Sequence, residues 1–149
     1  MPDKKISTSN LLQRLFKTTN IKSFIKRYDK QIAYMPFNAY LANLCEMRDT
    51  VPERVIKKSG IERTYGHQLF SGRRKPSRDK VIQLAFGFDM DYDEIQEFLK
   101  TARKSLLYPK IKRDAVIIYA LKRKLSIDSV QATLLELELP VLGREDRYE

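Results

Sequence analysis

The residues whose types and spacing could do chemistry are concentrated in residues 59–78, "SGIERTYGHQLFSGRRKPSR". This stretch holds the single His of the chain, His67, followed by a cluster of Arg and Lys. A His binds metal only together with other ligands, and the single Cys, Cys45, falls on the apolar face of another predicted helix. Arg and Lys side chains bind the phosphates and base edges of nucleic acids. The stretch therefore indicates binding of an anionic partner rather than catalysis or a metal site.

The charge of the whole chain favours the same class of partner. The 149 residues carry a formal net charge of +10, with a sequence pI near 9.7. Residues 57–80 contain eight basic and two acidic residues, a second basic excess covers 103–124, and the last twenty residues lean acidic. Such a basic patch is typical of proteins that bind nucleic acid, acidic lipid or an acidic protein. The cations at 122–124 also complement the end of a predicted helix without any ligand.

Several function classes are disfavoured. A single Cys cannot form an internal disulfide, and no apolar run approaches the roughly 18 residues of a membrane span, so we expect a cytoplasmic protein without a membrane partner. The sequence has no Gly-rich phosphate loop, no His and Cys cluster and no nucleophile–base signature. We therefore expect neither an enzyme nor a cofactor or metal site.

The elements that must position these residues are predicted to be helices throughout. Hydrophobic residues, 42% of the chain, recur at helical rather than strand spacing. We expect an all-α fold with an N-terminal helical arm over 1–34, a five-helix domain over 35–105, and a C-terminal helical hairpin and tail over 106–149. The arm should hold two helices, the first capped by Thr8 or Ser9 and the second beginning at Asn20.

Local signals mark helix ends in the central region. Thr50 with Glu53 and Asp91 with Glu94 have the spacing of capping boxes, in which the two residues bond reciprocally to each other's backbone. Ser77 is a further N-cap candidate. These signals predict helices that begin near residues 52, 78 and 92.

The segments 52–59 and 63–71 have the features of a helix-turn-helix. Two helices that meet at a steep angle need a tight turn, and Gly60 supplies the residue for it. Ile61 beside the turn is suited to fill the corner, and Leu69 to anchor the second helix from behind. The second helix would then expose a polar face to a DNA major groove.

The segment "PERVIKKSGIERTYGHQLFSGRRKPSRDKVIQLAFGF" resembles the XRE family (phage repressor/Cro-like) of bacterial transcriptional regulators. The resemblance covers about residues 37–102. It implies a repressor-like five-helix DNA-binding core containing a helix-turn-helix. It also implies sequence-specific double-stranded DNA binding, with the 63–71 helix in the major groove and a possible homodimer on two half-sites.

The resemblance assigns base-reading roles to four residues at the exposed face of the 63–71 helix: Arg63, Thr64, His67 and Gln68. Arg can donate two hydrogen bonds to guanine, and Gln can pair with adenine. It assigns DNA backbone contacts to Tyr65, Arg73, Arg74, Lys75, Ser77 and Arg78. A packed surface Tyr is an equal alternative for Tyr65, and a solvated loop is the alternative for the basic run.

Two residues depart from the family pattern. The family usually has a small residue where Ile56 stands and an apolar residue where Gly66 stands. We hypothesise a paired exchange, in which the bulky Ile56 fills the space that Gly66 vacates.

A second class of function stays open. The same fold serves in protein-interaction adaptors, and a basic helix-turn-helix domain can dock an acidic protein partner. RNA binding is a third possibility, although the region lacks the aromatic platform expected for single strands. The arm at 9–28 and the hairpin at 111–138 are both candidate dimer or effector surfaces.

Overall fold

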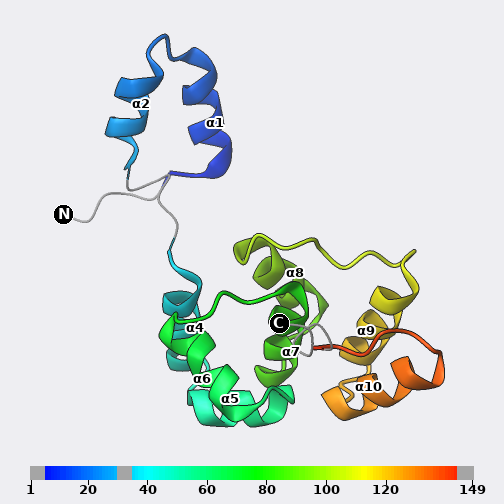
Figure 1. Ribbon diagram of the computed structural model, residues 1–149. Coiled ribbons are helices and arrows are strands. Elements are labelled where there is room, and N and C mark those ends of the chain that lie inside the picture. The colour runs from blue at the N-terminus through cyan, green and yellow to red at the C-terminus, as the bar shows by residue number, and fades with distance from the viewer. Residues whose placement is uncertain (1–5, 30–34, 144–149) are drawn as a thin grey trace. The chain divides into compact units, whose positions relative to one another are not determined.

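The computed structural model describes residues 6–29 and 35–143, and over these residues it contains helices and turns but no strand. The predicted all-α class is confirmed. None of the described helices is long and apolar enough to cross a membrane. The chain divides into two compact units, Met1–Met35 and Pro36–Glu149. In Figure 1 the described helices of the first unit are blue and those of the second run from cyan to orange.

Over its described residues, the N-terminal unit contains the helices α1 (Thr8–Lys17) and α2 (Ile21–Arg27). The side chain of Ser7 caps α1 by accepting from the Asn10 N–H, so the cap lies before Thr8 or Ser9. Asn20 caps α2 as predicted, accepting from the backbone N–H of Ser23.

The described contacts between α1 and α2 centre on Tyr28. The Phe24 and Tyr28 rings, 4.7 Å apart, are buried, and Arg14 Nη1 donates to the Tyr28 hydroxyl at 3.0 Å. Large apolar side chains on both helices stay exposed: Leu12, Leu15, Phe16, Ile21 and Ile25. Among the described residues of this unit, only Phe24 and Tyr28 are buried apolar side chains.

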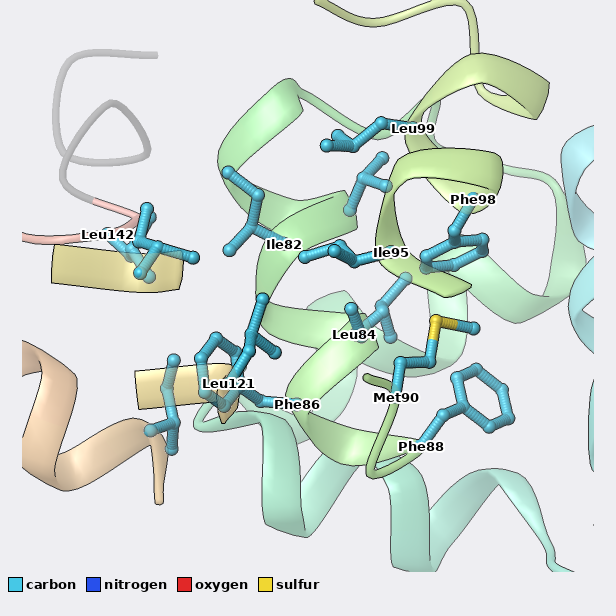
Figure 2. Packing of buried hydrophobic residues seen from close by; sticks show 14 of the residues in the cluster. Ile82, Leu84, Phe86, Phe88, Met90, Ile95, Phe98, Leu99, Leu121 and Leu142 are labelled. Atoms are coloured by element: carbon cyan, nitrogen blue, oxygen red, sulfur yellow. The ribbon is translucent and has the colours of Figure 1, made fainter. Parts of the chain in front are cut away.

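The second unit contains seven described helices: α4 (Phe37–Met47), α5 (Pro52–Ser59), α6 (Arg63–Ser71), α7 (Arg78–Gly87), α8 (Tyr92–Thr101), α9 (Lys112–Lys122) and α10 (Ile127–Glu136). They share one hydrophobic core, in which α7 is buried along its length after Asp79. Figure 2 shows Leu84 of α7 near Ile95 and Phe98 of α8, and Leu121 of α9 beside Phe86. The predicted division between residues 105 and 106 falls within this compact unit.

Most of the local signals act as predicted. The capping box of Asp91 and Glu94 is complete, and the Ser77 side chain accepts from the Lys80 N–H. The predicted capping box of Thr50 and Glu53 is wrong: Val51 is the N-cap of α5 and makes no side-chain cap hydrogen bond. The reason lies upstream, because the Thr50 N–H donates to the Cys45 carbonyl and closes the end of α4.

The helix-turn-helix segment has a left-handed turn. Gly60, at φ 74°, ends α5, a conformation that costs Gly little. α5 also lies against α7, where a Cβ atom added at Gly87 would be only 2.4 Å from the Val55 carbonyl oxygen. The position of α5 therefore depends on Gly at residue 87.

Two ion pairs join the start of α7 to the start of α9. Arg78 donates from Nη1 and Nη2 to both carboxylate oxygens of Asp114, at 3.2 and 2.9 Å. Arg113 donates to both oxygens of Asp79, at 2.8 and 2.7 Å. Each helix thus supplies one Arg and one Asp from adjacent positions, and we call these contacts the crossed ion pairs. They fasten the C-terminal hairpin to the helix that follows the basic loop.

Candidate nucleic-acid interface

α6 begins with a strong cap. Both carboxylate oxygens of Glu62 accept backbone hydrogen bonds, from Thr64 at 2.9 Å and from Tyr65 at 2.8 Å. These backbone bonds lower the pKa of Glu62, because they stabilise its charged form. Leu69 and Gly66 are the buried residues of the helix. The cap and the buried side fix which face of α6 is presented to solvent.

The exposed face of α6 carries three of the four predicted base-reading residues. The Arg63 side chain is 76% exposed and the His67 side chain 43% exposed, and Thr64 is also exposed. Gln68 is half-buried instead. The structure therefore brings Arg63, Thr64 and His67 together at solvent, one helical turn apart or less.

Glu53 of α5 connects two of these residues. Arg63 Nε donates to Glu53 Oε1 at 2.7 Å, and Glu53 Oε2 lies 2.5 Å from His67 Nε2. The hydrogen bond from Arg63, and then that from His67, lowers the pKa of Glu53, and the same carboxylate raises the pKa of Arg63. We call Glu53, Arg63 and His67 the Glu53 cluster.

The bond to Glu53 uses only one of the donor positions of Arg63. The two terminal Nη groups have no partner within residues 6–29 and 35–143, and they carry the paired N–H donors that fit a planar acceptor edge. Glu53 thus restricts the Arg63 side chain while leaving its forked end available.

Gln68 and Tyr65 are engaged with the basic loop. Arg74 Nε donates to Gln68 Oε1 at 2.6 Å, and the Arg74 guanidinium carbon lies 4.5 Å from the centre of the Tyr65 ring. Lys80, itself buried, places its ammonium 4.8 Å from the same ring. These cation–π contacts make Tyr65 a half-buried support for Arg74. The oxygen of the Gln68 amide is occupied by this network.

The loop after α6 presents exposed cations. Arg73, Arg74 and Lys75 are all exposed, and they lie between Gly72, at φ 85°, and the start of α7. Ser77 caps α7, which leaves the N-terminal end of that helix beside the loop. The positive end of a helix dipole and nearby cations favour an anion at this place.

Arg78 has a different role from the predicted phosphate contact. Besides its two bonds to Asp114, it donates from Nε to the Ser105 carbonyl at 2.9 Å and from Nη2 to the Leu106 carbonyl at 3.1 Å. Four of its five N–H donors are therefore used within the protein. Its guanidinium fastens the C-terminal hairpin and is not positioned as a surface phosphate ligand.

The structure shows no metal-binding cluster of His, Cys, Asp or Glu among the residues it describes. Cys45 is buried, and burial raises the pKa of its thiol, because the charged thiolate is disfavoured away from water. Its predicted place in the core is confirmed.

The roles of Glu53, Glu62 and Asp114 in holding the basic residues and the start of α6 were not predicted from the sequence. Glu53 and Arg63 are ten residues apart and meet only because the turn at Gly60 folds α6 back across α5. Asp114 lies 36 residues from Arg78. Once a helix-turn-helix is predicted, an acidic residue on its first helix can be expected to lie opposite the first turn of the second helix. This reasoning could have found the pair of Glu53 and Arg63.

Comparison with known proteins adds no relative to this geometry: no protein-family model, no curated protein and no solved structure matches the chain.

Proposed function

We propose that this protein is a sequence-specific double-stranded DNA-binding transcriptional regulator with a repressor-like core formed by α4–α8. In this proposal α6 enters the major groove as the recognition helix. The observation that carries the proposal is the Glu53 cluster: an exposed Arg63, held at Nε, lies beside Thr64 and His67 and keeps its forked end available.

The forked end of Arg63 suits guanine. Guanine presents O6 and N7 as neighbouring acceptors in the major groove, and two parallel N–H groups of one Arg can bond to both. A side chain already held by Glu53 loses less conformational freedom on binding than a free one. Arg63 is therefore the residue we assign to a guanine, with Thr64 and His67 contacting adjacent bases.

Phosphate contacts fall to the basic loop. Arg73 and Lys75 are exposed, and Arg74 reaches the surface over Tyr65. The N–H groups at the start of α7, behind Ser77, add a phosphate site of the kind that helix N-termini provide. Arg78 is left out of this set because it is bound to Asp114.

One recognition helix contacts only a few base pairs, so specific binding favours a dimer on two half-sites. The C-terminal hairpin offers exposed apolar side chains for such a contact: Tyr119 of α9 is 56% exposed, and Leu135 of α10 is 71% exposed.

The test is a binding selection with random duplex DNA at two salt concentrations. Arg63→Ala should change which sequences are selected, whereas Arg73→Ala should weaken all of them and reduce the salt slope by about one unit. Lys100→Ala, at an exposed position of α8, serves as the matched loss of one charge and should change neither result. Absence of any enriched sequence at low salt would contradict the proposal.

A second candidate function is supported by one observation. The N-terminal unit exposes Leu12, Leu15, Phe16, Ile21 and Ile25 beside basic side chains, which suits docking of an acidic protein with an apolar groove. If the protein is an adaptor, cross-linking should capture a protein partner with wild type but not with the Phe16→Ser variant. Neither protein should then enrich any sequence in the DNA selection. A variant that selects the wild-type DNA sequences with unchanged affinity supports the regulator instead.

A further inference from the structure

A pocket of about 420 Å³ lies where the ends of α5 and α7 meet the turn between α9 and α10. Its floor is apolar and consists of Phe86, Met90, Leu121 and Ile127, each no more than 7% exposed. Leu125, which is 38% exposed, forms part of the wall. Pockets of roughly 300–1,000 Å³ with an apolar lining are the usual size for small-molecule sites.

The rim of the pocket carries more positive than negative groups. Lys58 and Asp89, both lining residues, form an ion pair. Lys57 and Lys124 also line the pocket and form no ion pair within the described part of the chain. Asp128 is the remaining acidic lining residue. Beyond the Lys58–Asp89 pair, two ammonium groups therefore face one carboxylate.

The start of α10 adds to this positive field. Ser126, a lining residue, caps α10, and the N-terminal end of the helix is directed to the same place. The Ser126 side chain accepts from the Ser129 N–H, so the cap uses one of the free N–H groups of the first turn and leaves others. An acidic group at the rim would meet cations and helix N–H donors together.

We propose that this pocket binds a small organic anion, with a carboxylate or comparable acidic group at the rim and an apolar body on the floor. The apolar body covers Phe86, Met90 and Ile127, and the acidic group lies between Lys57 and Lys124. A purely polar anion would leave the floor uncovered, and an uncharged apolar molecule would leave the excess positive charge of the rim uncompensated.

The pocket lies beside the turn that precedes α6, so a ligand bound there is placed to affect that helix. Gly60, the turn residue between α5 and α6, lines the pocket, and a Cβ atom added there would lie 3.4 Å from Ile127 Cγ2. A bound anion therefore contacts both the turn before the recognition helix and the first residue of α10. Binding of the anion is independent of the proposed DNA-binding function, and only its role as an effector rests on that function.

The experiment uses octanoate as the probe and the full-length ¹⁵N-labelled protein without DNA. Saturable chemical-shift changes are expected at the backbone N–H groups of Gly60, Asp89, Leu125 and Ser126. 1-Octanol, which has the same chain without the charge, should bind about tenfold more weakly, as loss of one charge-assisted contact implies. Equal affinity for octanol and octanoate, or shifts scattered over all lysines without saturation, would overturn the proposal.

Matched variants separate the pocket from general attraction to a basic protein. Lys57→Gln with Lys124→Gln should weaken octanoate binding about tenfold or more, whereas Lys100→Gln with Lys112→Gln, at exposed positions outside the lining, should leave it unchanged. Leu125→Trp should narrow the pocket and reduce binding while the melting curve stays close to wild type. Equal weakening by the two Lys pairs would overturn the proposal.

Discussion

The Ile56 side chain occupies the space beside Gly66: a Cβ atom added at residue 66 would lie 2.6 Å from Ile56 Cγ2 and 2.7 Å from Cγ1. Ile56 is 2% exposed, so it has no room to move toward solvent without unpacking α5 from α6. The predicted contact, in which Ile56 fills the space beside Gly66, is confirmed. Close approach of the two helices of the helix-turn-helix depends on this large and small pair.

Adding a side chain at Gly66 should therefore destabilise the protein. We expect Gly66→Leu to lower the free energy of unfolding by about 1–3 kcal/mol, the usual cost of overpacking, even though Leu has the better helix propensity. Urea denaturation of the full chain measures the change. A Gly66→Leu protein as stable as wild type contradicts this account.

Removing the bulk of Ile56 supplies the control for that prediction. Ile56→Ala alone should cost about 2–5 kcal/mol, because it leaves a cavity. Combined with Gly66→Ala, it should cost less than the sum of the two single changes, since the new methyl group fills part of the cavity. Strict additivity of the two changes would show that the residues are not coupled.

The crossed ion pairs predict a large effect at Asp114. This residue is 1% exposed and accepts from Arg78 twice and from the Tyr108 N–H at 3.0 Å. Asp114→Ala should lower the free energy of unfolding by about 3–5 kcal/mol, because it leaves the partly buried Arg78 without its counter-charge. Asp89→Asn, at a paired but exposed carboxylate, should cost no more than about 1 kcal/mol. Equal melting temperatures for the two variants would rule this out.

Substitutions at Arg78 and at Arg73 should affect different properties, the first thermal stability and the second DNA binding. Arg78→Ala is expected to lower the melting temperature, since it removes four hydrogen bonds within the protein. Arg73→Ala, on the exposed loop, should leave the melting temperature unchanged and weaken DNA binding at low salt. Calorimetry and a fluorescence-anisotropy titration measure the two properties. If Arg78→Ala instead weakened DNA binding without lowering the melting temperature, Arg78 would be a phosphate contact as the sequence predicted.

Glu53 should titrate at lower pH than an isolated Glu. Its pKa lies below the ordinary value of 4.5, first because of Arg63 and then because of His67. A lowered folded-state pKa contributes stability above the ordinary value, and this contribution is lost as the pH falls through the folded-state pKa. Carboxyl ¹³C NMR should show the pKa of Glu53 rising toward 4.5 in Arg63→Ala. An unchanged titration in the variant would mean that the hydrogen bond does not persist in solution.

Glu53 should also influence which DNA sequences are selected. Glu53→Gln removes the charge that holds Arg63 Nε, so the preference for guanine at the Arg63 position should relax by roughly fivefold, within the 1–3 kcal/mol of a good bidentate contact. Binding to random DNA should strengthen slightly, because one negative charge is lost near the phosphates. Selection and anisotropy at matched salt test both effects. A uniform loss across all sequences would indicate a purely structural role.

Features set by neighbouring residues could be predicted from the sequence. The left-handed turn at Gly60, the Ser77 cap and the capping box of Asp91 and Glu94 depend on residues within one turn of each other. The prediction of a capping box at Thr50 failed because the Thr50 N–H, which the box would bond to Glu53, already donates to the Cys45 carbonyl at the end of α4.

Features that depend on folding across the chain could not be predicted. The spacing of Glu53 to Arg63, or of Arg78 to Asp114, has no periodic signature, and each pair forms only when two helices meet. For the same reason, the sequence showed a basic residue at position 78 but not the buried carboxylate that binds it. The sequence therefore shows which charged residues a surface patch contains, but it does not show which residue each of them pairs with.

The crossed ion pairs also bear on how this protein can be divided or recombined. A fragment that stops before residue 106 would keep Arg78 and Asp79 but lose Asp114 and Arg113, as well as the hairpin residues Ile117, Leu121 and Leu134 of the shared core. The helix-turn-helix of this chain therefore cannot be moved to another protein without the hairpin. A chimera that takes α5 and α6 from this chain must therefore also include the C-terminal hairpin formed by α9 and α10.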